Sequence, residues 1–120
     1  MLFRSTAGSL DAVRDLSDVH DVVRAYRLLA LGGEPGSVYN VCSGTGTAIS
    51  ELAERLLRLA RVSLRIETDP ALVRPAEVPV LVGDPTRLHD ATGYEPAYAT
   101  DATLAAVLQH ARAAVAAQGS

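Results

Sequence analysis

The sequence predicts an α/β fold in a single domain, and three observations support this. Short β-prone runs alternate along the chain with segments whose apolar residues recur every three or four positions. Hydrophobic residues make up 48% of the 120 residues and charged residues 21%, a balance that favours a packed core over disorder. The length suits one domain and is too short for two.

The first half of the chain is expected to hold two strands, each followed by a helix. Residues 12–16 form the first strand, and Asp18 is placed to cap the next helix, which glycines at 32 and 33 end. Residues 38–42 form the second strand, and residues 49–60 an amphipathic helix. The first helix carries one apolar stripe, formed by Val19, Val22, Val23, Tyr26 and Leu29.

The sequence of the second half of the chain predicts shorter elements and a long final helix. Residues 62–66 alternate as a half-buried strand, and three prolines make residues 69–79 extended and stiff. A short strand at 80–82 and a helical turn from 83 to about 91 follow. The last helix starts at Thr100 or Asp101 and frays after Ala117. Its expected inward residues are Leu104, Val107, Leu108, Ala111 and Val115. Residues 1–7 remain unassigned, residues 8–117 form the domain, and residues 118–120 form a tail.

Charge and cysteine content exclude several classes of protein. A formal net charge of −3 and a pI near 5.5 give no general attraction for nucleic acids or anionic membranes. No apolar run approaches the roughly 20 residues of a membrane span, and the N-terminus has no secretory h-region. The single cysteine, Cys42, has no partner for an internal disulfide. We therefore expect a cytoplasmic protein without a metal site.

Most candidate sites favour a structural interpretation. Residues 43–46 lie between a strand and a helix, where phosphate groups can bind, but Ile49 replaces the third glycine of a dinucleotide fingerprint. None of His20, His89 and His110 has a second metal ligand four residues on, so surface histidines are the simpler interpretation. We expect no catalytic, cofactor-binding or metal-binding residue in this chain.

Two arginines and one acid stand in more informative settings. Arg14 lies at a predicted strand end, and Arg74 lies where prolines restrict the backbone. A guanidinium held on a stiff segment can grip a diphosphate through paired N–H···O bonds. The carboxylate of Glu77 offers two acceptors for ribose hydroxyls. From spacing alone two interpretations of these arginines remain: they are solvated surface side chains, or they form a site for an anionic ligand.

Several blocks, in order, resemble the extended short-chain dehydrogenase/reductase family of nucleotide-sugar enzymes. Residues 8–26, GSLDAVRDLSDVHDVVRAY, resemble its GNL(D/E)AxRDFxDVxDVxxAY block, and residues 36–44 resemble its GxxYNVxSG strand. Residues 74–79 and 83–88 are similar to its RPx(D/E)xP and GDx(S/T)(K/R)L segments, and residues 92–96 to the turn before its last helix. The nearest resemblance is to GDP-mannose 4,6-dehydratases and GDP-6-deoxy-4-keto-mannose reductases.

The resemblance implies roles for three residues. Arg14 and Arg74 occupy the positions expected to hold the sugar diphosphate, and Glu77 the acidic position near the nucleotide ribose. It also implies that the fold is the C-terminal portion of a Rossmann-type enzyme, with the N-terminal half absent. That half carries the Gly-x-x-Gly-x-x-Gly motif for NAD or NADP and a catalytic Tyr-x-x-x-Lys pair. Neither motif occurs here, and the chain has no lysine at all.

Three functional hypotheses follow. The favoured one is the GDP-sugar-binding portion of an NAD(P)-dependent dehydratase or reductase, a fragment or complementing subunit without independent catalysis. The second is a non-catalytic module that binds a nucleotide-sugar. The third is an interaction protein whose core another chain completes, either an N-terminal Rossmann half or a second copy. In an intact member of the family, the strand at residues 39–41 joins the Rossmann sheet, so its edge is expected to be unpaired here.

Overall fold

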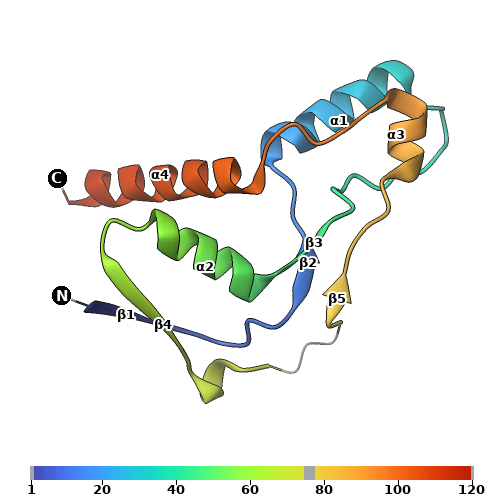
Figure 1. Ribbon diagram of the computed structural model, residues 1–120. Coiled ribbons are helices and arrows are strands. Elements are labelled where there is room, and N and C mark those ends of the chain that lie inside the picture. The colour runs from blue at the N-terminus through green and yellow to red at the C-terminus, as the bar shows by residue number, and fades with distance from the viewer. Residues whose placement is uncertain (1, 75–77, 120) are drawn as a thin grey trace.

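The structure is a computed structural model, and it describes residues 2–74 and 78–119. Helices and short strands alternate along the chain, as the sequence predicts (Figure 1). In chain order the elements are β1 (Leu2–Ala7), β2 (Val13–Asp15), α1 (Val19–Gly32), β3 (Gly46–Ala48), α2 (Ile49–Leu59), β4 (Ser63–Thr68), the 3-10 turn η1 (Pro70–Leu72), β5 (Val80–Leu81), α3 (Thr86–Thr92) and α4 (Thr100–Gln118).

The strands form two small sheets. β2 is the middle strand of one sheet, antiparallel to β3 and parallel to β5, with Arg14 opposite Thr47 on one side and Leu81 on the other. β1 and β4 pair in parallel as the second sheet. The sequence did not predict β1, because the two-stranded sheet that gives this segment a partner forms only when β4 lies beside it. β3 was also missed, since three residues rich in Gly and Thr show no apolar alternation.

The predicted caps of α1 and the predicted pattern of β4 are confirmed. The Asp18 side chain accepts a hydrogen bond from the His20 amide at 2.8 Å, and the amide of Gly33 donates to the Leu29 carbonyl. In β4, Leu64 and Ile66 are half-buried and Arg65 between them is exposed. On α2, Glu51 and Arg55, four residues apart, form an ion pair at 2.6 Å.

The buried centre lies where α1 packs against α3. Ala25, Leu88 and Tyr94 are 0%, 0% and 2% exposed, and Leu28, Leu29 and Val41 pack around them. Elsewhere in the described chain, Leu52 on α2 is the one further buried hydrophobic residue. A cluster this small leaves most apolar side chains of the chain in partial or full contact with solvent.

The predicted apolar stripe of α1 is buried only in part. Val19, Val23 and Tyr26 are 65%, 61% and 61% exposed, because α1 packs through the neighbouring face that carries Asp21 and Ala25. Val22 and Leu29 of the stripe are half-buried, and Leu29 packs against the buried centre. The helical pattern was correct, but the surface that would bury its exposed residues is not in the described part of the chain.

Two extended segments also differ from expectation. The strand predicted at residues 38–42 does not form, since no described strand lies beside it to pair with its backbone. Within the predicted extended stretch 69–79, residues 70–72 form the η1 turn instead. The Asp69 side chain caps that turn by accepting from the Ala71 amide at 2.9 Å. The short strand at β5 and the helical turn α3 appear where they were expected.

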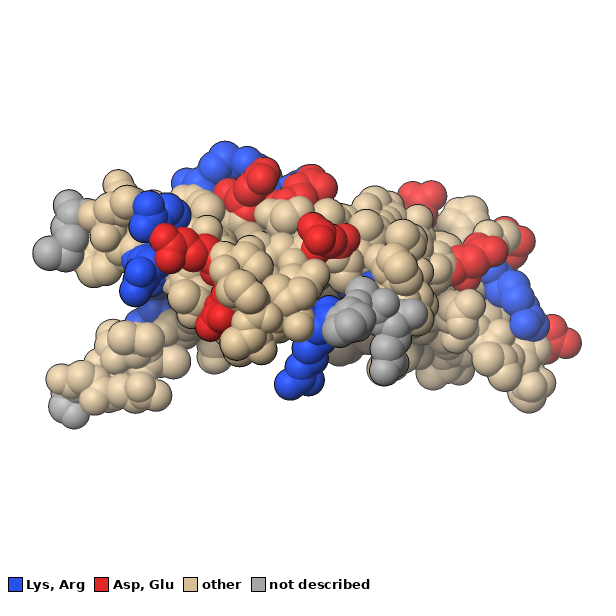
Figure 2. All heavy atoms as spheres, turned by 90° about the horizontal axis from the view of Figure 1, so that it is seen from below, with Lys and Arg blue, Asp and Glu red and all other residues tan. Residues whose placement is uncertain are grey.

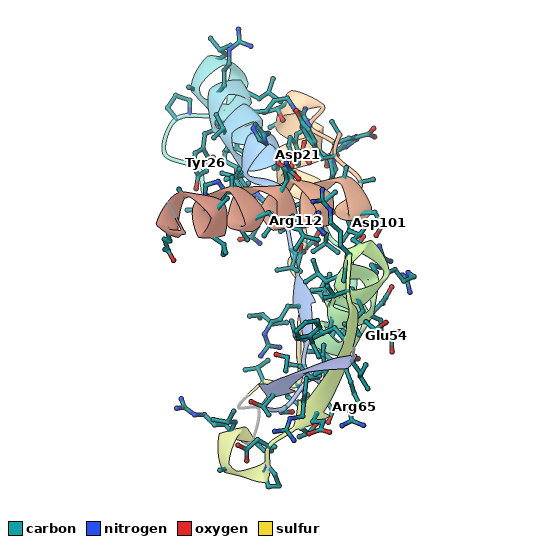
Figure 3. All side chains as sticks on the ribbon, turned by 90° about the vertical axis from the view of Figure 1, so that its left-hand side faces the viewer. Asp21, Tyr26, Glu54, Arg65, Asp101 and Arg112 are labelled. Carbon is teal, nitrogen blue, oxygen red and sulfur yellow. The ribbon has the colours of Figure 1, made fainter. Side chains whose placement is uncertain are left out.

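The last helix begins at Thr100 as predicted, but fewer of its residues pack inward. Leu104 and Leu108 are half-buried, whereas Ala111 is exposed and Val107 and Val115 are 59% and 69% exposed. α4 has 19 residues and α2 has 11, so about 12 Å of α4 extends beyond the helix that it packs against. Arg55 to Asp101 and Arg112 to the Leu59 carbonyl, both at 3.1 Å, join the two helices (Figure 3).

The molecule is open for its size. Its radius of gyration is 17.6 Å, against about 14 Å for a compact chain of this length. Its accessible surface is 8563 Å², whereas a compact monomer of 12.6 kDa exposes about 6,200 Å². In the side view of Figure 3, α1, α3 and α4 form one end, and β1, β4 and η1 form the other. None of the described helices is long and apolar enough to cross a membrane.

Candidate functional site

Arg14 lies on β2, between two paired strands. Because side chains directly opposite each other share a face of a sheet, Thr47 and Leu81 flank Arg14 on its own face. Arg14 is half-buried as a residue, and its Nη1 donates to the adjacent Val13 carbonyl at 2.9 Å. Among the described residues no carboxylate pairs with it. Arg14 therefore retains N–H donors for a ligand.

The next residue, Asp15, points to the opposite face of β2 and binds two loops. One carboxylate oxygen accepts from the Ser43 amide at 2.9 Å and the Ser43 hydroxyl at 2.6 Å. The other oxygen accepts from the amides of Gly44 at 2.9 Å and Gly83 at 3.2 Å. Partial burial would raise the pKa of Asp15, but these hydrogen bonds outweigh it and hold the pKa below its ordinary value.

Both glycines bound by Asp15 are required by the local backbone. Gly44 has φ +78°, in the left-handed region that favours glycine. A Cβ atom at Gly83 would lie 2.5 Å from the Cys42 sulfur, so only glycine permits this close approach. The glycine turn that resembles a phosphate cradle in the sequence therefore serves to bind an aspartate of the same chain.

Arg74 is exposed and follows η1 by two residues. At one end of its segment, the Leu72 carbonyl packs so closely on Gly8 that a Cβ there would collide with it. At the other end, the Val13 amide donates to the Pro79 carbonyl at 2.9 Å. The segment that carries Arg74 is thus attached at both ends to the segment 8–15, which carries Arg14. Glu77, the third predicted site residue, lies outside the described residues.

A hollow of about 200 Å³ opens beside this sheet. Thr47, the cross-strand neighbour of Arg14, lines it together with Ser43 and Thr45, and the acidic residues Asp18 and Asp21 line it as well. Hydroxyl groups both donate and accept hydrogen bonds, which suits a polar ligand. The sequence showed no signal for this hollow, because its lining comes from three separate segments.

The structure also describes the setting of the cysteine and of the potential metal ligands. Partial burial raises the pKa of the Cys42 thiol, so it is a poor nucleophile. No group of three or more His, Cys, Asp or Glu side chains suited to a metal ion occurs among the described residues. In Figure 2, arginines and acidic residues are interspersed on the visible face and do not gather into one basic patch. Binding of an anion at the candidate site would therefore rely on particular arginines and not on a broadly basic surface.

Comparison with known proteins identifies the family. Residues 4–107 match the family model of GDP-mannose 4,6 dehydratase. The chain belongs to this family. It is 46% identical over 105 residues to GDP-6-deoxy-D-mannose reductase of Pseudomonas aeruginosa, covering 88% of this chain and 34% of the reductase. The resemblance seen in the sequence is thereby confirmed.

Two solved structures agree with the fold. RMD from Pseudomonas aeruginosa complexed with NADPH aligns with a TM-score of 0.82 and 44% identity, covering 88% of this chain and 34% of that one. UDP-glucose 4-epimerase of Thermotoga maritima with UDP-glucose aligns with a TM-score of 0.80 and 26% identity, covering 94% and 35%. The chain matches the C-terminal part of Rossmann-type enzymes of this kind and spans about a third of the length of its relatives.

Proposed function

We propose that this chain is the nucleotide-sugar-binding portion of an NAD(P)-dependent dehydratase or reductase of the GDP-mannose 4,6-dehydratase family. It binds a GDP-sugar and has no independent catalysis, because it contains neither the cofactor glycine motif nor a lysine for the Tyr-x-x-x-Lys pair. Its family membership and its similarity to GDP-6-deoxy-D-mannose reductase support this substrate class.

The observation that carries the proposal is the setting of Arg14. A half-buried cation without an anionic partner is unfavourable unless a ligand supplies the negative charge. Arg14 is in that position within the described part of the chain, on a strand held from both sides. A diphosphate carries the charge and the paired oxygens that a guanidinium fork binds best.

Arg74 and Glu77 complete the proposed site. Arg74 adds a second guanidinium from the segment attached to residues 8–15, and its exposure leaves it free to reach a ligand. Glu77 accepts hydrogen bonds from the ribose hydroxyls. Two cations on separate segments would hold the diphosphate from both sides and set the orientation of the nucleotide and the hexose.

The proposed partner is an N-terminal Rossmann half, which supplies NAD or NADP and the catalytic Tyr and Lys. The open structure supports this, since Val19, Val23 and Tyr26 on α1 are exposed and residues 38–42 lack a neighbouring strand among the described residues. The two halves together would form the active enzyme. A second copy of this chain is the alternative partner for the same surface.

Calorimetric titration of the 120-residue chain with GDP-mannose tests the binding function. The double variant Arg14→Ala, Arg74→Ala is expected to bind at least about 100-fold more weakly, because two charge-assisted contacts are lost. The matched control, Arg27→Ala with Arg61→Ala, removes two exposed arginines and should stay within about twofold of the parent. A parallel titration with UDP-glucose tests the preference for guanine.

Two results would contradict the proposal: absence of heat at millimolar GDP-mannose, or equal affinity of the parent and the Arg14, Arg74 double variant. Mixing the chain with an N-terminal half from a relative separates the enzyme portion from a purely binding module. Restored dehydratase or reductase activity supports the first, and binding without any restored activity supports the second.

A further inference from the structure

The Asp15 carboxylate joins three segments that surround the proposed diphosphate site. Asp15 follows Arg14 on β2, and its oxygens bind the loop at Ser43 and Gly44. They also bind the amide of Gly83, two residues after β5. β5 follows the segment that carries Arg74. The Asp15 side chain therefore links β2, which carries Arg14, to the residues just after β5.

Only a carboxylate satisfies this arrangement. Four donors converge on Asp15, two on each oxygen, at 2.6 to 3.2 Å. An asparagine has one acceptor oxygen, and its NH2 group would face N–H donors at the other end. In one orientation the NH2 group of an asparagine would face the Ser43 amide, and in the other it would face the amides of Gly44 and Gly83. Two donors would then oppose each other, and the loops would have to move.

The arrangement affects Arg14 directly because the two residues are neighbours on one short strand. Asp15 points to one face of β2 and Arg14 to the other. β2 has only three residues, so its position depends strongly on what holds its end. Fixing the Asp15 side chain against two loops fixes the peptide from which the Arg14 guanidinium extends.

We propose that Asp15 is a positioning residue for diphosphate binding, whose carboxylate sets Arg14 relative to β5 and the Arg74 segment. This inference rests on the proposed function, since it requires that Arg14 and Arg74 bind the ligand. Asp15 itself carries negative charge and does not touch the diphosphate. Its effect on binding passes through Arg14.

The first test is the affinity of the Asp15→Asn chain for GDP, measured by calorimetry. We expect binding at least about tenfold weaker, while circular dichroism shows retained helix content. Asp84→Asn is the matched control, because the Asp84 carboxylate also binds an amide and a hydroxyl, at 3.0 and 2.5 Å, but both belong to Thr86 in its own turn. That variant should stay within about twofold.

A double-mutant cycle separates positioning from a general loss of stability. Arg14→Ala should weaken GDP binding by at least about tenfold in the parent, but by less than about threefold in the Asp15→Asn chain, because the guanidinium there is already misplaced. Ser43→Ala removes one of the four hydrogen bonds and should give an intermediate loss. It is the variant to use if Asp15→Asn does not fold.

The outcomes distinguish the two proposals. If the parent does not bind GDP, or if Arg14→Ala binds like the parent, the proposed function and this inference both fail. If Arg14→Ala loses affinity while Asp15→Asn and Ser43→Ala bind normally, only this inference is overturned. Additive effects of Asp15→Asn and Arg14→Ala also overturn it.

Discussion

Asp21 lies in the first turn of α1, is 1% exposed, and binds the loop that precedes α4. Its carboxylate accepts from the amides of Ala97 at 3.0 Å and Tyr98 at 3.2 Å, and from Arg24 at 3.0 Å. Burial would raise the pKa of Asp21, but these hydrogen bonds and the charge of Arg24 outweigh it and lower the pKa. Asp21 is thus a stabilising group whose contribution requires ionisation.

The stability of the chain should therefore fall in acid. Because the pKa of Asp21 is lower in the folded chain than its ordinary value of 3.8, its contribution is complete above about pH 4 and is lost as the pH falls through the folded pKa. Asp21→Asn should lower the free energy of unfolding at neutral pH by about 1–3 kcal/mol and weaken its dependence on pH. Denaturant unfolding between about pH 7 and pH 3 measures both. Asp11→Asn, an exposed aspartate, is the control, and an unchanged pH dependence in Asp21→Asn would be evidence against this role.

Removing the polar group of Tyr94 should not lower the stability of the fold, in contrast to Asp21. Tyr94 is 2% exposed, and its hydroxyl has no hydrogen-bond partner among the described residues. Burial raises its pKa. A buried hydroxyl without a partner is destabilising, so Tyr94→Phe should be neutral or raise the melting temperature. A clear loss of stability in thermal unfolding would show instead that the hydroxyl has a partner.

At the scale of elements, α2 lacks a side-chain cap. Its N-cap residue is Ala48, in the extended conformation of a capping residue but without a side-chain hydrogen bond. The amides of Ile49 and Ser50 donate to the carbonyls of Ala12 and Leu10, at 3.0 and 2.9 Å. The Glu51 amide, at the third helical position, is the one that a capping side chain would bind.

Ala48→Ser should stabilise the chain by about 0.5–2 kcal/mol, because a serine there can accept from the Glu51 amide. Thermal unfolding measures the gain. Ala105→Ser, on an exposed position inside α4, is the control and should be neutral or slightly destabilising. If both serines had the same effect, capping would not be the cause.

Local signals explain which elements were predictable. Asp18 before an apolar repeat and glycine after it located α1, and alternation located β4. Prediction failed where the formation of a strand depends on a partner strand that is distant in the sequence. Residues 38–42 have strand propensity but no partner strand, and β1 became a strand only through β4.

The candidate site was predictable only in part, for a similar reason. The sequence marked Arg14, Arg74 and Glu77, because their motifs carry the family resemblance. It did not show that Asp15 holds Ser43 and Gly83, since these contacts join residues 28 and 68 positions apart. Hydrogen bonds between distant loops leave no periodic signal in the sequence.

At the scale of the whole molecule, the chain exposes about 2,400 Å² more than a compact monomer of its mass would. This excess is larger than the about 800 Å² that one partner contributes to a standard interface and matches one partner's share, about 1,000–2,500 Å², of an obligate one. Apolar side chains on the open face of α1 contribute to it, including Val19, Val23 and Tyr26. The molecule has the surface expected of one part of a larger folded unit.

We therefore expect a 1:1 complex between this chain and the part of the Pseudomonas aeruginosa reductase that it does not match. Size-exclusion chromatography with light scattering should detect the complex after co-expression. Val23→Asp, on the open α1 face, should weaken it by at least about tenfold, because a charge would be buried at an apolar contact. Val62→Asp, 51% exposed before β4, is the control. If Val23→Asp and Val62→Asp weakened the complex equally, the open face of α1 would not be the contact surface.

The central claim is that two guanidinium groups from separate segments converge on one diphosphate. A structure of the chain with GDP-mannose, alone or in the reconstituted complex, tests it most directly. We predict that nitrogens of both Arg14 and Arg74 lie within about 3 Å of diphosphate oxygens. A bound ligand that contacts neither arginine, or only one of them, would contradict the claim.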